Sequence, residues 1–293
     1  MRHARVVFGV KSSPFLLEDV LEHHLKKYLK SSTYSKRTVD ILLRSFYVDD
    51  LITSLDNESE ILPFIEECHH ILAEGKFNLR GWNYTGDDDP EQVASVLGLI
   101  WNRREDDLKI NLDWIEAYEF EIASKRVILS VTHRIFDPVG FLCHVLLMPK
   151  PMLQKMWKDN IPWDREVENN IKLQFLKWFE ELGSLKNLSV IRCFYPASSG
   201  QHGISAHTFC NASQFEYAAA VFVRFECADV VQVNLLAAKS RVAPVKTITN
   251  PRLGLLAATV GARLCRSVLS ALPWDNVKQH YWTYHHCVRL DSA

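Results

Sequence analysis

Apolar residues near the start of the chain recur mostly at helical spacing. The stretch FGVKSSPFLLEDVLEHHLKKYLK (8–30) predicts a loop followed by an amphipathic helix, with Ser13 as the N-cap and Pro14 in the first helical position. A second helix is predicted over 58–74, where Gly75 supplies a C-terminal stop.

Two short apolar runs between these helices flank a pair of acids. Ile41–Val48 and Leu51–Ser54 have the composition of strands, and Asp49 and Asp50 lie between them. This pattern predicts a β-hairpin with the acids at its tip. Two more strands are predicted on either side of a turn-rich loop, over Phe77–Trp82 and Val96–Trp101.

The middle of the chain is predicted to be helical, and its last part has the pattern of a sheet. Helices are expected over 121–134 and 167–182, and a domain boundary is expected near 183–188. The last part predicts three strands, a helix and a final strand, over Gly203–Asn211, Tyr217–Glu226, Val230–Ala238, Pro251–Leu272 and Gln279–Thr283. This succession makes an α/β unit, so the predicted class is α/β (α+β).

Composition places the chain among ordinary globular proteins. Its 293 residues suffice for two modest domains, and hydrophobic residues make up 47% of them. Apolar stretches such as Phe141–Met148 are too short to cross a bilayer, and the N-terminus lacks a signal-peptide pattern. The seven cysteines are dispersed without a CxxC pair. We therefore expect reduced thiols, an intracellular location (cytoplasmic or nuclear) and no membrane association.

The net charge of −1 gives no compositional support for nucleic-acid binding. Proteins that grip a phosphate backbone usually carry a basic excess, because phosphate contacts supply most of the affinity. A local basic groove remains compatible with this charge.

The string Tyr47-Val48-Asp49-Asp50 carries the first candidate chemistry. Side chains alternate along a strand, so one acid faces a site while the other supports it. Polymerases use this arrangement to help hold Mg²⁺. For an Asp-Asp pair alone, ordinary turn chemistry is the alternative. The whole string between two apolar runs resembles the catalytic motif of retroviral-type reverse transcriptases.

Other strings resemble further blocks of Bel/Pao-type retrotransposon enzymes, in the same order. FGVKSSPF resembles the loop after the first catalytic strand, GKFNLRGW the next block, VLGLIWNRREDDLKI the primer grip, and SVTHRIFDPVGFLCHVLLMPKPMLQKMW the connection region. The resemblance covers nearly the whole chain. It implies a partial reverse-transcriptase palm and thumb (1–115), a helical connection region (116–185) and a truncated ribonuclease H-like domain (186–293). It also implies an RNA/DNA template-primer partner and Mg²⁺ in the ancestral enzyme.

The resemblance implies a further polymerase carboxylate ahead of FGVKSSPF, where this sequence has seven residues. We expect the first palm strand and its acid to be missing. Asp49 and Asp50 would then bind Mg²⁺ weakly at best. The hairpin would also keep an unpaired edge, which would make the N-terminal part the less stable one.

The resemblance places three acids in the ribonuclease H-like part, and this chain lacks one at each position. Asn211 lies between Phe-Cys and Ala-Ser, where the family has Asp. Gly254 takes the acid position in the helix that begins Pro-Arg-Leu, and Tyr284 takes the position after Tyr-Trp-Thr. A fourth acid is expected beyond Ala293.

Each replacement has a physical consequence for metal binding. Asn211 keeps an oxygen but loses the charge, while Gly254 has no side chain and weakens its helix by about 1 kcal/mol relative to Ala. Tyr284 is uncharged at neutral pH. A Mg²⁺ site without carboxylates has little to offset dehydration of the ion, so no cofactor is expected. Each change is one nucleotide from an acidic codon, which fits decay and selection for an inactive binding domain alike.

Other reactive side chains form no recognisable site in the sequence. Cys68-His69-His70 and the His and Cys residues of 280–287 lack the paired spacing of a zinc site. Ser205 and His207 lack the order of a hydrolase triad. This part of the family is often labelled Pao retrotransposon peptidase, yet no Asp-Thr-Gly or Asp-Ser-Gly tripeptide supports an aspartic protease.

Basic and tryptophan residues leave alternatives open. A solvated face is preferred over a nucleic-acid groove for Arg103, Arg104, Lys109, Lys125, Arg126 and Lys150. Core or helix packing is preferred over base stacking for Trp101, Trp157, Trp163 and Trp178.

Three functions are consistent with these patterns. The missing acids favour a catalytically inactive fragment of a Pol polyprotein. The alternatives are a co-opted module that binds RNA–DNA hybrid without catalysis, and an enzyme piece that acts when another chain supplies its missing half.

Overall fold

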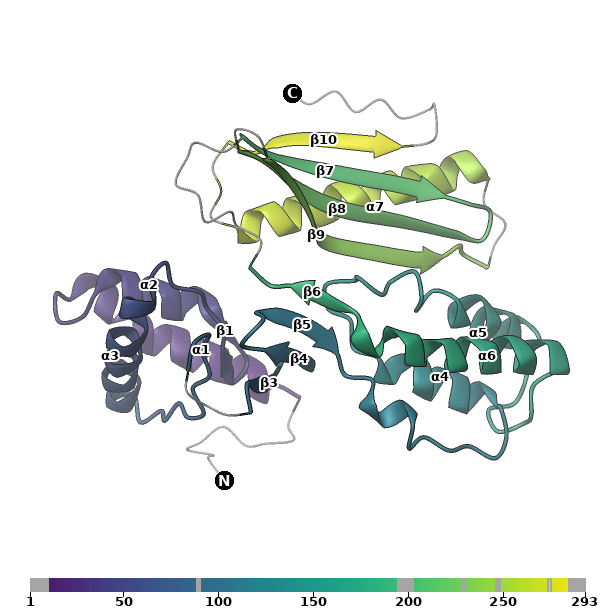
Figure 1. Cartoon of the computed structure of the whole chain (residues 1–293), viewed down its shortest axis with the longest axis horizontal. Coiled ribbons are helices and arrows are strands. Elements are labelled where there is room, and N and C mark those ends of the chain that lie inside the picture. The colour runs from purple at the N-terminus through teal and green to yellow at the C-terminus, as the bar shows by residue number, and fades with distance from the viewer. Residues whose placement is uncertain are drawn as a thin grey trace. The chain divides into compact units, whose positions relative to one another are not determined.

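A computed structural model describes residues 11–87, 91–193, 203–227, 230–245, 249–272, 274 and 276–283 (Figure 1). The chain divides into two compact units, Met1–Trp82 and Asn83–Ala293, which are described separately. Helices and strands are mixed in the described residues, which confirms the predicted α/β class. The division into three domains at 115 and 185 stays a prediction.

The first unit is a small helical cluster with a short hairpin. Its elements are α1 (Ser13–Lys26), α2 (Lys36–Ser45), β1 (Phe46–Tyr47), β2 (Asp50–Leu51) and α3 (Ile61–Glu74). Leu25, Leu42 and Ile71 form its core with four other buried residues, because each helix turns one apolar face inward. His24 lies in this core, with its Nε2 donating to the Ile71 carbonyl oxygen at 2.7 Å.

Four predictions for the first unit were wrong in detail. Of the strand predicted over Leu51–Ser54, only Leu51 lies in a strand, β2. Ile41–Val48 was predicted as a strand, but residues up to Ser45 belong to α2. Thr38, Val39, Ile41 and Leu42 are buried on one side of that helix, so a helical spacing was misread as a strand. Phe77–Trp82 forms no strand, and the capping position of α1 is Ser12, whose side chain makes no capping hydrogen bond. The predicted helix ending before Gly75 is confirmed as α3.

The second unit begins with an antiparallel sheet in the order β3-β4-β5-β6. Its strands are β3 (Val93–Val96), β4 (Leu99–Asn102), β5 (Asp107–Ile110) and β6 (Ser189–Ile191). The single strand predicted over Val96–Trp101 is wrong, because Leu97 and Gly98 turn the chain with positive φ angles of 48° and 76°. Since β6 pairs with β5, residues on both sides of the predicted boundary near 183–188 meet in one sheet.

Three helices pack around the largest apolar cluster of this unit. They are α4 (Lys125–Arg134), α5 (Pro149–Lys158) and α6 (Asn169–Glu181). Ile128, Met156 and Phe175 are fully buried between them. The helix predicted over 121–134 begins at Lys125 because the Ser124 side chain caps it, accepting from the Val127 amide. The helix predicted over 167–182 is confirmed as α6.

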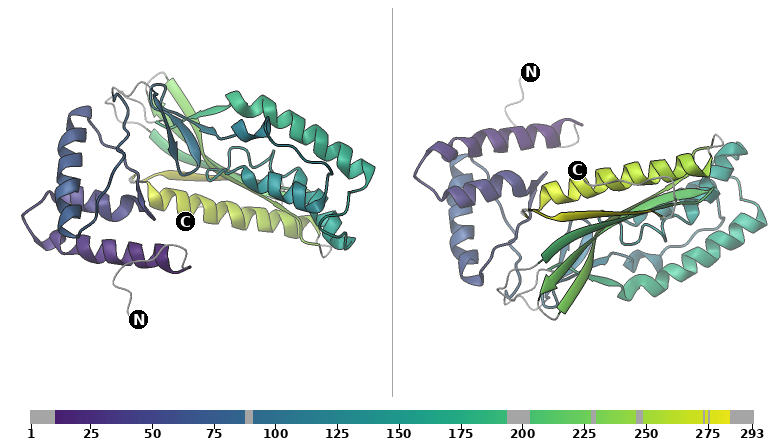
Figure 2. Two further views of the ribbon diagram at one scale, coloured as in Figure 1. Left: turned by 90° about the horizontal axis from the view of Figure 1, so that it is seen from below. Right: turned by 90° about the horizontal axis from the view of Figure 1, so that it is seen from above.

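The last part of the chain forms a second four-stranded sheet with one long helix. Its elements are β7 (Gly203–Ala212), β8 (Glu216–Cys227), β9 (Val230–Val242), α7 (Asn250–Ala271) and β10 (Lys278–Thr283). The strand order is β10-β7-β8-β9, and β10 runs parallel to β7 while the other pairs are antiparallel. Every element predicted here is confirmed, and α7 lies along one face of the sheet (Figure 2).

Helix α7 approaches the sheet closely. A Cβ on Gly261 would lie 2.3 Å from Cys210 Sγ, so only glycine fits at this contact. Leu253, Ala257 and Leu264 are buried on the same side of α7. By length and composition alone α7 would also cross a membrane, a test that the core helix of a globular domain passes as well.

The loop after α4 covers the edge of the second sheet. The Ala238 amide of β9 donates to the Val139 carbonyl at 2.9 Å, and Ser240 Oγ donates to the Cys143 carbonyl at 2.7 Å. Gly140, with φ of +89°, brings the backbone against Ala238, where a Cβ would lie 1.9 Å from the carbonyl oxygen. Two backbones thus meet at the edge of β9, which is shielded there from strand addition.

Substituting Gly140 by Ala should destabilise the second unit. A left-handed residue with a Cβ costs about 1–3 kcal/mol, and the clash with Ala238 adds to this cost. Urea denaturation followed by tryptophan fluorescence measures the change. Gly183→Ala is the matched control, because nothing lies within 4 Å of a Cβ at Gly183. Equal stability of the two variants would contradict this account of the edge contact.

Substituting Gly261 by Ala should destabilise the contact between α7 and β7, by about 1–3 kcal/mol for an overpacked core. The double variant Gly261→Ala/Cys210→Ala should recover part of the loss, because it removes the sulfur that the new methyl group would strike. Thermal unfolding followed by circular dichroism compares both variants with Cys210→Ala alone. Strictly additive effects would show that the two positions do not contact each other.

Candidate functional site

The predicted polymerase acids lie on the hairpin of the first unit. Asp49 is in the turn, where Val48 has a φ of +59°, and Asp50 pairs with Tyr47 across the hairpin. Both carboxylates are exposed. The predicted position of the acids at a hairpin tip is therefore confirmed, although each strand has only two residues. Their catalytic role stays a prediction.

Asn211 and Gly254, two of the three positions predicted to have lost ribonuclease H acids, fall at one end of the second sheet. Asn211 is the last residue but one of β7, and Gly254 is buried in the first turns of α7. Thr283 ends β10 and pairs in register with Cys210. Leu253 packs in the same cluster as Cys210, so the start of α7 meets the carboxyl end of β7. Tyr284 follows Thr283 and lies outside the described residues.

The side chains at this end of the sheet do not suit a divalent cation. Asn211 is exposed, and its Oδ1 accepts a hydrogen bond from the Ala212 amide at 2.8 Å. Gly254 has no side chain and therefore supplies no metal ligand. Within the described ranges, no three His, Cys, Asp or Glu side chains gather closely enough to hold a metal ion. Mg²⁺ prefers carboxylate oxygens, so these residues do not fit it.

The face of the sheet opposite α7 carries a set of nearly parallel rings. Alternation along β7 buries Ala206, Thr208 and Cys210 toward α7 and leaves His207 and Phe209 on the open face. Phe209 lies 6.1 Å from Trp282 of β10, with an interplanar angle of 14°. His207 lies 4.8 Å from His280 at 19°. Phe209 and Trp282 keep exposed fractions of 47% and 51%.

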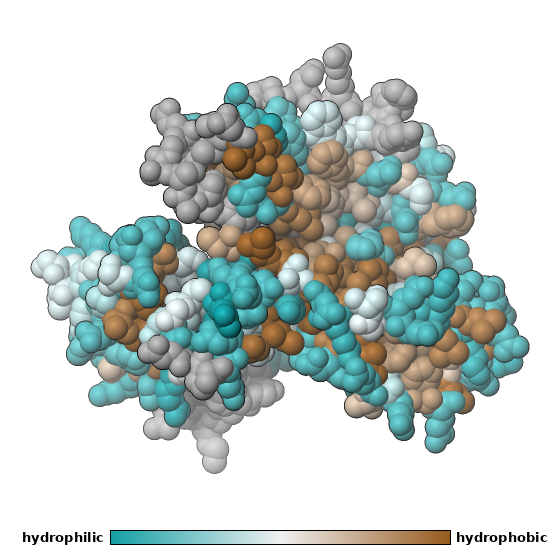
Figure 3. Space-filling view, in the orientation of Figure 1, coloured by the Kyte–Doolittle hydropathy of each residue, from teal (hydrophilic) through white to brown (hydrophobic). Residues whose placement is uncertain are grey.

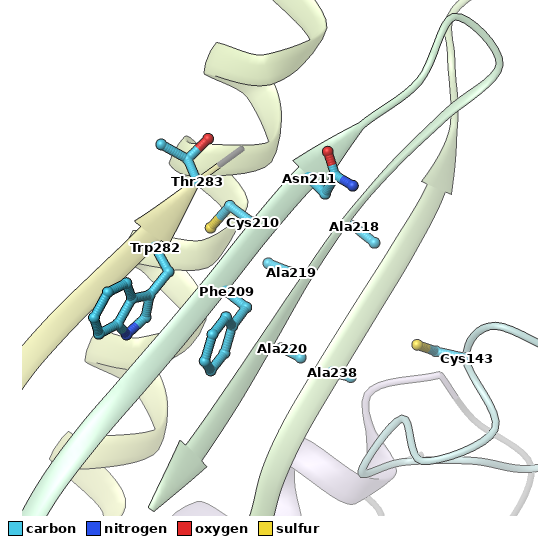
Figure 4. Close-up of a pocket in the computed structure, with 10 residues that line it drawn as sticks. All are labelled: Cys143, Phe209, Cys210, Asn211, Ala218, Ala219, Ala220, Ala238, Trp282 and Thr283. Atoms are coloured by element: carbon cyan, nitrogen blue, oxygen red, sulfur yellow. The ribbon is translucent and has the colours of Figure 1, made fainter. Parts of the chain in front are cut away.

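Two of these rings, Phe209 and Trp282, border a groove of about 460 Å³ on the open face (Figure 4). Its floor is formed by small residues of β8 and β9, which include Ala218, Ala220 and Ala238. Phe209 and Trp282 stand on one side, and Cys143 lies on the other. Figure 3 shows apolar residues gathered over this face of the sheet. We call this feature the alanine groove.

Sequence reasoning missed the alanine groove. The run Ala218-Ala219-Ala220 was a usable signal, because alternate positions of a strand without large side chains leave a hollow in a sheet. Nothing in the sequence indicated that β10 would pair with β7 or that the loop at Cys143 would form the opposite wall.

The structure brings Ser205 and His207 within hydrogen-bond distance, at 3.1 Å between Oγ and Nε2. Trp282 donates its indole N–H to His207 Nδ1 at 3.2 Å, so a neutral His207 carries its proton on Nε2. Burial lowers the pKa of His207, and His280 and Arg224 add to this effect. His207 therefore donates to Ser205 and does not activate it as a nucleophile.

Two basic residues considered for a nucleic-acid groove are buried. Arg103 has an exposed fraction of 0% and forms an ion pair with Asp87. The ammonium of Lys125 lies 4.8 Å from the ring centres of both Trp157 and Trp163. The expectation of a solvated face is thus wrong for Arg103 and Lys125. Neither is placed to contact a phosphate.

The cysteine and histidine run of the first unit is also structural. Cys68 is fully buried in the helical core, and burial raises the pKa of its thiol to about 12. His69 accepts a hydrogen bond from the Trp82 indole at 3.0 Å. Of the second His and Cys set, His285, His286 and Cys287 lie outside the described residues.

Comparison with solved structures finds a similar fold in a foamy viral protease-reverse transcriptase. A foamy viral protease-reverse transcriptase in complex with RNA/DNA hybrid matches with a TM-score of 0.54 and 16% identity, over 95% of this chain and 33% of that one. The same kind of protein in complex with dsDNA matches with a TM-score of 0.52 and 17% identity, over 96% of this chain and 52% of that one. The chain thus spans between a third and about half of these proteins, and the likeness concerns the fold.

Sequence comparison identifies the family. No curated protein sequence matches the chain. The family model described as a Pao retrotransposon-like RNaseH-like domain matches residues 124–285, which include α4 to α6 as well as the second sheet and α7. This match covers more than half of the 293 residues, and it agrees with the fold of the solved neighbours. The chain therefore belongs to the Pao retrotransposon-like RNaseH-like domain family.

Proposed function

We propose that this chain is a non-hydrolysing ribonuclease H-like part of a Bel/Pao-type Pol polyprotein, joined to a reverse-transcriptase palm remnant. The observation that carries the proposal is the meeting of β7, β10 and α7 at one end of the sheet, with Asn211 and Gly254 at that end. The family resemblance places carboxylates at both positions.

Hydrolysis in this fold needs charge that these residues lack. Two Mg²⁺ ions activate water and stabilise the leaving oxygen, and carboxylates from several elements hold them. Asn211 is neutral, and its oxygen already accepts from the Ala212 amide. Gly254 offers only backbone, which is engaged in a helix. The fold can persist under these changes because its buried contacts are apolar.

Restoring the acids should restore metal binding. The variant Asn211→Asp/Gly254→Glu/Tyr284→Asp should bind Mn²⁺ measurably in isothermal titration calorimetry, and the unmodified chain should not. Asn211→Ala/Gly254→Ala/Tyr284→Ala is the control for disturbance of the fold. The unmodified chain should also leave an RNA–DNA hybrid uncut in Mg²⁺. Cleavage that Asn211→Ala abolishes would contradict the proposal.

A second candidate function is binding of nucleic acid without catalysis. The solved neighbours were captured with RNA/DNA hybrid and with dsDNA, which supports the same ligand class here. The open face of the sheet adds exposed aromatic rings, and Lys278 lies on this face two residues before His280. Aromatic rings next to basic residues are typical of nucleic-acid surfaces.

The binding candidate predicts salt-sensitive affinity. Fluorescence anisotropy of a labelled RNA–DNA hybrid should show binding at low ionic strength, and log Kd should rise linearly with log salt because counterions are released. Lys278→Ala should reduce the slope by about one. Lys177→Ala on α6, which pairs with Glu181, is the control. Absence of binding at low ionic strength would eliminate this candidate.

A further inference from the structure

The rings on the open face form a stack that runs across the strands. Trp282 and Phe209 are direct neighbours in the β10–β7 register, as are His280 and His207. The small interplanar angles between these cross-strand neighbours show that the ring planes are nearly parallel to one another. The next strand beyond Phe209 in the sheet is β8.

The stack stops at β8, where alanines replace aromatic residues. Ala220 lies opposite Phe209, and Ala238 lies opposite Ala220 on β9. Neighbouring strands are about 4.8 Å apart, so the missing side chain leaves the width of one more ring beside Phe209. Cys143 bounds the far side, as Figure 4 shows. The alanine groove is thus the empty next position of an aromatic stack.

Two side chains flank Phe209 on the open face. Phe222 of β8 pairs in register with His207 and contacts Phe209 edge to face, at 84° and 5.8 Å. Asn211 lies one row beyond Phe209 on the same face. The Asn211 oxygen accepts from the Ala212 amide, which leaves its NH₂ group as a donor beside the groove.

We propose that the alanine groove binds an unpaired base of a single strand, stacked on the exposed part of the Phe209 ring. The proposal deepens the nucleic-acid binding function given above and rests on it. A flat base matches the one-ring width and apolar floor, and its carbonyl oxygens can accept from the Asn211 amide. Base stacking depends little on the nucleotide sequence, because every base has an aromatic face.

The charges on this face suit a single strand better than an apolar peptide. Lys278 lies on the open face of β10, beyond the stacked rings. Arg224 also lies on this face, but its charge is already paired with Glu226 in an ion pair. A strand whose base occupies the groove can lay its phosphates toward Lys278.

Fluorescence of 2-aminopurine tests the proposal, because stacking quenches this base. The full chain is titrated with a blunt RNA–DNA hybrid and with the same hybrid carrying a short overhang that contains one 2-aminopurine. We expect quenching and about tenfold tighter binding of the overhang form, in line with the effect of one stacked base.

Two variants remove the groove in different ways. Phe209→Ala removes the stacking face, and Ala220→Leu fills the floor while Phe209 stays. Each should abolish the quenching and bring the ratio of overhang to blunt affinity close to one. Leu255→Ala is the control, since Leu255 is exposed on α7. Circular dichroism verifies that every variant is folded.

Four results would overturn the proposal. Blunt binding with no preference for the overhang would remove the groove as a base site and leave nucleic-acid binding standing. If neither the blunt hybrid nor the overhang form binds, both the base site and the nucleic-acid binding function are ruled out. Unchanged quenching in both groove variants would place the base elsewhere. A dimer that Phe209→Ala dissociates in sedimentation, without an effect on the overhang, would assign this face to a second copy of the chain.

Discussion

The close fit of α7 against β7 and β8 is the contact on which the candidate site depends. A glycine at position 261 lets the helix lie against Cys210, and Leu253 and Ala257 continue the contact toward the helix start. This contact fixes the first turns of α7 beside the carboxyl end of β7. It also leaves the opposite face of the sheet free, where the rings and the alanine groove lie. One packing contact thus positions both the end of the sheet with Asn211 and Gly254 and the open face with the alanine groove.

The contact explains how this fold can lose its carboxylates and persist. Its energy comes from apolar side chains on one face of α7 and alternate positions of the strands. Clustered carboxylates repel one another and tend to destabilise a fold. A neutral residue such as Asn211 at the same place removes this repulsion. The chemistry and the fold of such a domain therefore rest on different residues, and either can change without the other.

The helical region before the second sheet is physically joined to it. Backbone and side-chain hydrogen bonds from the loop after α4 reach β9, and Gln154 of α5 donates to the Ala243 carbonyl at 2.7 Å. Gly140 permits this approach because its left-handed backbone and lack of a Cβ avoid Ala238. These contacts agree with a family match that spans α4 to β10 without a break. They also supply the wall of the alanine groove at Cys143.

Local pattern in the sequence determined most of the elements and the family. The alternation of β7, the long apolar face of α7 and the ordered motifs were all readable, because they depend on neighbours in the chain. The pattern failed at Ile41–Ser45, where short apolar runs fit a helix as well as a strand. Only the tertiary structure decided which residues meet across the sheet. The parallel pairing of β10 with β7 aligns Trp282 with Phe209, and the loop at Cys143 closes the groove. Such contacts join residues far apart in sequence, and the energy that selects them belongs to the packed core as a whole.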